Sequence, residues 1–220
     1  IYYFCCKRIP MVNTVSTNTE QFFKDAFTDL KIDANRIKLL QSIALFITNE
    51  VKQNKCVNLN YICTHNSRRS QLAQVWSSYA AYYFKFTEIF SFSGGSMATA
   101  FYKNTVKTLQ EVGFNFQILE FSHQNPVYSI GYKNGINPII GFSKLYDSEH
   151  NKKPFIAITT CSSADENCPF IPDAIERFHL PFNDPKMFDN TLYQSEKYLE
   201  ANKQIAGEIH FIFNFIKNSI

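Results

Sequence analysis

Long hydrophobic runs are missing from this 220-residue chain. Its longest apolar stretch, residues 209–216, is interrupted by Asn214 and falls well short of the roughly 18 residues that a membrane helix needs. A long basic run is missing too, because 22 lysines and arginines against 19 acidic residues leave a net charge of only +3. The sequence therefore predicts neither a membrane nor nucleic acid as a partner, and any anion site must be local.

An export signal is also lacking, since the apolar start of the chain is too short for a signal-peptide core and lacks a small-residue cleavage pattern. We expect residues 1–16 to be a disordered or non-native leader, with Met11 as the natural start. Without export, the protein is predicted to be cytoplasmic and its six cysteines to be reduced thiols. A functional cysteine in that compartment is more often catalytic, redox-active or metal-binding than structural.

The hydrophobic periodicity predicts one α/β domain over residues 17–220. Residues 17–55 have helical spacing and form a predicted two-helix extension, in which Asp33 caps the second helix. Strands and helices then alternate, with strands at 57–62, 88–92, 155–160 and 175–180 and helices at 69–84, 102–112 and 189–218. Such alternation favours a parallel sheet covered by helices on both faces.

Residues 122–153 form a predicted β-like insertion in this alternation, after a further strand candidate at 116–121. Within the insertion, the short runs 127–132 and 138–142 flank the pair Asn134-Gly135, which is a hairpin signal.

A cysteine ends the strand at 57–62, and an arginine begins the helix after it. Five residues separate Cys63 from Arg69, namely Thr64, His65, Asn66, Ser67 and Arg68. Backbone N–H groups in such a turn converge on an anion, and the N-terminus of the helix adds positive charge on the same side. The guanidinium of Arg69 can donate two parallel hydrogen bonds to a tetrahedral oxyanion. The loop therefore predicts an oxyanion site.

The same surroundings favour the thiolate form of Cys63, which would make this residue a nucleophile. Ser70 is placed to bond the sulfur and Asn66 to hold the loop. The other candidates for oxyanion binding are Thr64, His65, Ser67 and Arg68. The alternative is an ordinary buried cysteine at a strand end beside a basic helix start.

The segment from Cys63 to Gln71, with Leu72 and Ala73 after it, resembles the signature loop of the low-molecular-weight protein tyrosine phosphatase superfamily, most of all its thioredoxin-coupled arsenate reductase branch. The resemblance continues at residues 93–95, 161–169 and 182–185, and it covers about residues 57–121 and 155–220. It implies a flavodoxin-like, three-layer fold with a four-stranded parallel sheet, and an enzyme with no bound cofactor or metal.

The resemblance makes Asp184, in the pair Asp184-Pro185, the general acid. A carboxyl group on a separate loop can protonate a leaving oxygen on the far side of the oxyanion. The alternative is that Asp184-Pro185 is only a turn, which such pairs often form.

The resemblance also assigns a redox relay to Cys161 and Cys168. In the enzymes that the chain resembles, the first cysteine expels arsenite and forms a disulfide with the nucleophile, and the second takes over that disulfide and presents it to thioredoxin. A zinc site is disfavoured because the spacing is not Cys-x2-Cys and because the nearest histidine, His179, reads as part of a strand. Two unrelated buried thiols remain an alternative.

The loop departs from the family pattern at two positions. His65 stands where the family usually has glycine, which permits a backbone angle that most residues resist, and its ring adds a donor at the rim. Arg68 stands where the family often has another cysteine, and it either adds charge near the anion or is a solvated residue on an exposed helix start. The specificity for the oxyanion is therefore open.

Three functions follow in order of preference. The first is a thioredoxin-coupled arsenate reductase using Cys63, Arg69, Asp184, Cys161 and Cys168. The second is a phosphatase that hydrolyses a Cys63-phosphate intermediate, and the third is a non-enzymatic module that only binds an oxyanion. The residue after Asp184-Pro185 is a lysine, whereas tyrosine phosphatases of the family commonly have tyrosine there.

Overall fold

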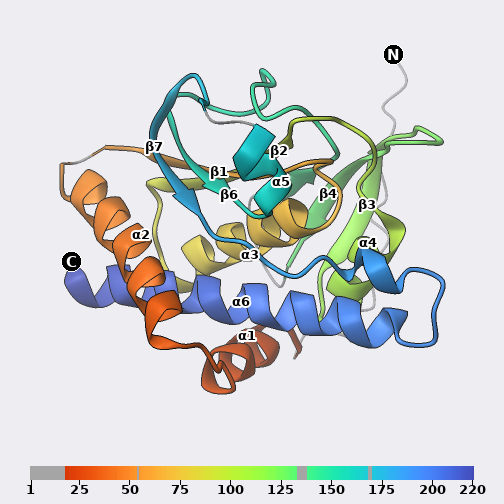
Figure 1. Cartoon of the computed structure of the whole chain (residues 1–220), viewed down its shortest axis with the longest axis horizontal. Helices are drawn as coiled ribbons and strands as arrows, with labels where there is room; N and C mark the ends of the chain where they lie inside the picture. Colours follow the sequence, from red (N-terminus) through yellow and green to blue (C-terminus); the bar gives the residue numbers. More distant parts are fainter. Residues whose placement is uncertain (1–17, 54, 133–137, 168–169) are drawn as a thin grey trace, which may run out of the picture.

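The computed structural model describes residues 18–53, 55–132, 138–167 and 170–220. Its centre is a parallel four-stranded sheet in the order β2-β1-β6-β7 (Figure 1). The strands are β1 (Val57–Cys63), β2 (Ile89–Gly95), β6 (Phe155–Thr159) and β7 (Ala174–His179). This order, with a layer packed on each face of the sheet, confirms the predicted flavodoxin-like α/β fold.

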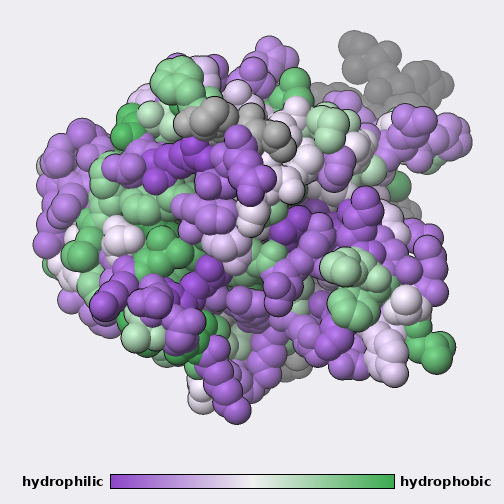
Figure 2. Space-filling model, in the orientation of Figure 1, coloured by the Kyte–Doolittle hydropathy of each residue, from purple (hydrophilic) through white to green (hydrophobic). Residues whose placement is uncertain are grey.

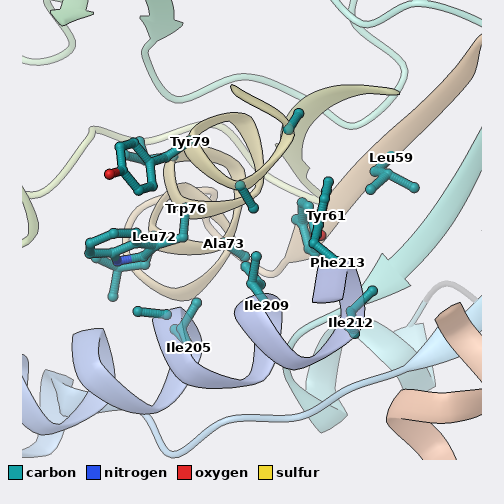
Figure 3. Close-up of a cluster of buried hydrophobic side chains, with 14 of the residues drawn as sticks. Leu59, Tyr61, Leu72, Ala73, Trp76, Tyr79, Ile205, Ile209, Ile212 and Phe213 are labelled. Atoms are coloured by element: carbon teal, nitrogen blue, oxygen red, sulfur yellow. The ribbon is translucent and has the colours of Figure 1, made fainter. Parts of the chain in front are cut away.

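Helices α3 (Arg69–Phe84) and α6 (Gln194–Ser219) cover one face of the sheet. Figure 3 shows Leu59 and Tyr61 of β1 pointing into the core that Trp76 of α3 and Ile209 of α6 help to fill. Helices α1 (Asn18–Thr28) and α2 (Ala34–Lys52) pack on α6 and account for the predicted extension. Asp33 caps α2 as predicted, because its Oδ1 accepts the N–H groups of Asn35 and Arg36 at 2.8 Å each.

The other face of the sheet carries a smaller layer. The polar members of the alternating strand β1 point to it: Asn58 donates to the carbonyl of Pro154 and Asn60 to that of Tyr146, both at 2.9 Å. The short helix α5 (Ser162–Asn167) lies there as well, with Ala164 buried beside the sheet. Residues 162–167 show no helical period in the sequence, although they form this helix. Tertiary bonds hold this short turn, since Asp165 accepts from Thr159 and pairs with Arg177.

A second sheet is antiparallel and has the order β3-β4-β5. It consists of β3 (Asn115–Glu120), β4 (Val127–Gly131) and β5 (Ile139–Gly141), and it follows α4 (Lys103–Glu111). The antiparallel pairing of β4 with β5 agrees with the predicted hairpin, whose turn at 133–137 lies outside the described residues, as does the predicted leader at 1–16. The final helix begins at Gln194 instead of Asp189, because a 3-10 turn, η1 (Pro185–Phe188), precedes it.

The face of the molecule shown in Figure 2 is mostly hydrophilic, and hydrophobic residues appear mainly on the side where α2 lies. Exposed Leu45 of α2 and Ile175 of β7 are among the large hydrophobic side chains at the surface. Within the described ranges, no helix combines the length and the apolar character that crossing a membrane requires.

Candidate active site

The loop between β1 and α3 turns its carbonyl groups away from its centre. Each carbonyl from Cys63 to Arg68 accepts a hydrogen bond. In chain order, the donors are Ser96 N, Met97 N, Ser143 Oγ, Gln71 Nε2, Tyr102 N and Leu72 N, at 2.8–3.3 Å. Because successive carbonyls bind outward, the N–H groups between them are left to face inward.

Those inward N–H groups are free to bind an anion. Across the described residues, no protein acceptor is bonded to the backbone N–H of Thr64, His65, Asn66, Ser67 or Arg68. They lie at the N-terminus of α3, a helix of 16 residues, whose dipole adds positive character at the same place. Free N–H groups at the N-terminus of a helix can hold an anion, and we call this arrangement, which starts at Cys63, the nest.

Asn66 holds the loop in shape. Its φ angle of 44° places it in the left-handed region, which asparagine tolerates better than most residues. Its side-chain oxygen accepts from the backbone N–H of Lys144 at 2.9 Å, and its Nδ2 donates to Ser70 Oγ at 2.9 Å. The unusual backbone angle therefore falls on Asn66 and not on His65, where the family pattern made us expect it.

Cys63 is buried, with 4% of its surface exposed, and its sulfur lies 3.1 Å from Ser70 Oγ. A hydroxyl at that distance can donate to a thiolate and stabilise its negative charge. The Ser70 hydroxyl also accepts from Asn66, so its position relative to the sulfur is set from two sides.

Arg69 reaches across the site to the loop before η1. Its Nη2 lies 2.6 Å from Asp184 Oδ2, and its Nη1 donates to the carbonyl of Phe182 at 2.9 Å. Asp184 also caps η1 by accepting from the N–H of Lys186. The predicted anion holder and the predicted acid are thus brought together, although 115 residues separate them in the chain.

Arg68 is neither solvated nor turned into the nest. Its side chain is buried and bonds Tyr198 Oη and Asp189 Oδ2, each at 2.7 Å, while its guanidinium stacks 4.0 Å from the Tyr102 ring. Tyr198 in turn donates to Asp189 at 2.7 Å. The solvated interpretation of Arg68 was wrong, because Tyr198 of α6 and the Tyr102 ring pack against this side chain. Only the backbone of Arg68 borders the nest.

Cys161 lies beside the loop. It is 3% exposed, and its sulfur is 3.4 Å from Thr64 Oγ1, one residue from the nucleophile candidate. Cys63 and Cys161 are both free thiols in the same buried cluster. Cys168 lies outside the described residues. His179 belongs to β7 and contacts Thr159 and Asp165, and the described part of the chain holds no group of three His, Cys, Asp or Glu side chains suited to a metal ion.

Several residues that support the loop were missed from the sequence. Ser143 and Lys144, from the predicted insertion at 122–153, bond the loop at His65 O and Asn66 Oδ1. Gly95 allows the loop to approach β2, because a Cβ there would lie 2.8 Å from both Thr64 O and Asn66 N. Only the resemblance at residues 93–95 signalled Gly95, and no local pattern marks Ser143 or Lys144, whose partners lie 78 residues away.

Sequence comparison finds relatives that are named arsenate reductases. The chain is 30% identical over 125 residues to the arsenate reductase of Brevibacillus brevis, covering 57% of this chain and 74% of the relative. It is 29% identical over 125 residues to arsenate reductase 2 of Staphylococcus epidermidis, covering 57% and 76%. It is 28% identical over 138 residues to the arsenate reductase of Bacillus subtilis, covering 63% and 79%.

Structure comparison finds a low-molecular-weight phosphotyrosine phosphatase from Vibrio cholerae, with a TM-score of 0.48, 11% identity, and coverage of 71% of this chain and 93% of the other. It also finds a thioredoxin-dependent arsenate reductase from Corynebacterium glutamicum, with a TM-score of 0.44, 18% identity, and coverage of 92% and 86%. No family model matches the chain.

Proposed function

Because the chain belongs to the arsenate reductase family, within the low-molecular-weight protein tyrosine phosphatase superfamily, we propose that it reduces arsenate to arsenite with Cys63 as nucleophile. The observation that carries this proposal is the nest itself. The loop's carbonyls point outward, its N–H groups are free, and the buried sulfur of Cys63 lies at its start. A tetrahedral oxyanion is the ligand that such a cradle fits.

In the first step the Cys63 thiolate attacks arsenic. An S–As bond forms and one As–O bond breaks, with the oxygen leaving as water after it receives a proton from Asp184. The free N–H groups of the loop hold the remaining oxygens, and Arg69 shares the negative charge.

Arg69 and Asp184 must change partners for this step. In the free protein Asp184 faces the Arg69 guanidinium at 2.6 Å, whereas a general acid must face the leaving oxygen with a proton. An arsenate dianion in the nest offers Arg69 two oxygens in place of Asp184. Binding of the substrate would thereby release Asp184 from Arg69 and let it turn to the leaving oxygen.

Reduction then requires a second thiol. The Cys161 thiolate attacks the Cys63 sulfur, the S–As bond breaks, and its electron pair stays on arsenic, which leaves as arsenite in the +3 state. The position of Cys161 Sγ, 3.4 Å from Thr64 Oγ1, supports this role. Cys168 next attacks Cys161 and releases Cys63 as a thiolate, and two electrons from the dithiol of thioredoxin reduce the Cys161–Cys168 disulfide. The enzyme itself needs no bound cofactor in this scheme.

The test is arsenate-dependent NADPH oxidation in the presence of thioredoxin and thioredoxin reductase. We expect Cys63→Ser, Cys161→Ser and Cys168→Ser each to abolish turnover. Cys56→Ser is the matched control, because Cys56 is an exposed free thiol outside the loop, and this variant should keep the activity of the parent protein.

Two results would contradict arsenate reduction by this protein. If arsenate is not turned over, but p-nitrophenyl phosphate is hydrolysed by every variant except Cys63→Ser, then the chain is a phosphatase and the relay is wrong. If neither compound reacts and arsenate still binds, the nest serves only to bind oxyanions.

A further inference from the structure

A pocket of about 780 Å³ opens on the edge of the parallel sheet, outside the Cys63–Arg69 loop. The strand order makes β2 the edge strand, and Ile89, Phe90, Ser91 and Phe92 of β2 form one wall. The C-terminal part of α3 and the segment around β5 form the other walls. Its volume lies within the range of small-molecule sites.

Six phenylalanine and tyrosine rings contribute to the walls of this edge pocket. They are the rings of Tyr82, Phe86, Phe90, Phe92, Tyr132 and Phe142. Aromatic walls bind flat apolar groups through offset-stacked and edge-to-face contacts, each of which adds to the gain from burying the surface. The shape and lining therefore suit an aromatic ring system.

The charge in the edge pocket has a single sign. Lys85, Lys144 and Lys152 line it, and no aspartate or glutamate does among the residues that the structure describes. Among the described residues, none of the three lysines forms an ion pair with a carboxylate. A ligand that fits this wall is negatively charged.

Lys144 points most directly to a ligand. Only 6% of its surface is exposed, and its Nζ has no hydrogen-bond partner in the described part of the chain, with only the face of the Phe142 ring 4.7 Å away. Burial lowers the pKa of Lys144 to about 8, so at pH 7 roughly nine in ten molecules still carry the ammonium charge. A largely buried ammonium without a counter-ion has lost part of its hydration, and an anion bound beside it offsets that loss.

We propose that the edge pocket binds an aromatic carboxylate, whose ring system lies among the aromatic walls and whose carboxylate pairs with Lys144. Lys152, which lies over the Phe90 ring at 4.5 Å, adds attraction at the mouth. This inference is independent of the chemistry at Cys63, since no residue of the nest lines the pocket.

The test is isothermal titration calorimetry at pH 7 with 2-naphthoate, which has two fused rings and one carboxylate. The neutral isostere 2-naphthamide and the cation 2-naphthylmethylammonium are titrated in parallel. We expect 2-naphthoate to bind with a dissociation constant on the order of 100 μM or tighter. The amide should bind about tenfold more weakly and the cation not at all.

Variants separate the role of Lys144 from a general effect of charge. Lys144→Met should weaken 2-naphthoate about tenfold and leave 2-naphthamide unchanged. Lys152→Met, at an exposed position, should weaken 2-naphthoate only a few-fold, and the matched control Lys107→Met, on the exposed side of α4, should have no effect. Thermal unfolding of each variant checks that it is folded.

The proposal is overturned if 2-naphthoate and 2-naphthamide bind equally well, if neither binds, or if Lys144→Met and Lys107→Met have the same effect. Because the readout is binding, its failure is distinct from a failure of arsenate turnover.

Discussion

Arg69 and Asp184 are each other's partner, with Nη2 and Oδ2 2.6 Å apart. Their side chains are 14% and 32% exposed, so the pair sits at the opening of the site and not deep within it. The residue proposed to hold the anion thus keeps the proposed acid within reach until a substrate competes for the guanidinium.

Because of this pairing, we expect Asp184→Asn to change kcat and KM for arsenate differently. The amide cannot donate an acidic proton, so kcat should fall at least about 100-fold. It also removes the carboxylate that competes with arsenate for Arg69, so KM should stay level or fall. Steady-state kinetics with arsenate measures both, with Asp29→Asn at the exposed Lys203 pair as the control. An unchanged kcat would remove Asp184 from the mechanism.

Asn66 should be among the more sensitive positions for stability. Asn66→Ala removes the bonds to Lys144 N and Ser70 Oγ and puts alanine at a φ angle of 44°, and it should cost about 3 kcal/mol. Asn66→Gly loses the same bonds without the backbone strain, so it should cost about 1 kcal/mol less. Urea unfolding of the two variants gives the difference, and equal costs would mean that the backbone angle is not under strain.

Arg68 should act through the fold and not through the anion. Its guanidinium and Asp189 form a largely buried pair, so Arg68→Met should leave the Asp189 carboxylate without a cation, bonded only by the Tyr198 hydroxyl, and cost about 3 kcal/mol of stability. Adding Asp189→Asn to that variant should cost little more, because the charge left alone is then removed. A double-mutant cycle by urea denaturation tests this, and additive losses would contradict the buried pair.

His210 should make the folded protein less stable at acidic pH. It lies among the rings of Phe23, Phe27 and Phe84, and burial lowers its pKa to about 4, against about 6.5 in an unfolded chain. Between these values the unfolded state binds more protons than the folded state, so stability falls as the pH drops from 6.5 towards 4.

His210→Phe should flatten that part of the profile, because phenylalanine does not titrate. The comparison uses urea midpoints of both proteins at pH 7.5 and 5, since the other titrating groups are common to the two. Equal changes in the midpoint would show that His210 does not titrate with a lowered pKa.

Lys144 should affect the stability of the protein on the alkaline side of the pH range. With a pKa of about 8 when folded and about 10.4 when unfolded, the full cost of its buried charge is present below pH 8 and is relieved as the pH rises to 10.4. Lys144→Met should therefore be more stable than the parent protein at pH 7, by about 2 kcal/mol, and this advantage should shrink by pH 10. Thermal unfolding at the two pH values measures it, and a less stable Lys144→Met would mean that the ammonium has a partner.

The elements around Cys63 were predictable because their signals are local. The alternation of 57–62, the helical period of 69–84 and the Cys63-x5-Arg69 spacing all act over a few residues, and the fold forms β1, the loop and α3 there. The cap at Asp33 is local in the same way, since its partners are two and three residues away. The family, too, could be recognised from the loop and the short segments that accompany it.

Contacts between distant segments decided the rest. The sequence offered two places for Arg68, and the packing of α6 supplied a third, beside Tyr198 at a separation of 130 residues. The bond from Ser143 to His65, the pairing of Arg69 with Asp184 and the single-sign pocket beside β2 depend likewise on chain segments that meet only in the folded protein. Local periodicity reports which face of an element is buried, whereas the partner of a polar side chain depends on how those faces pack, and only the tertiary structure specifies that.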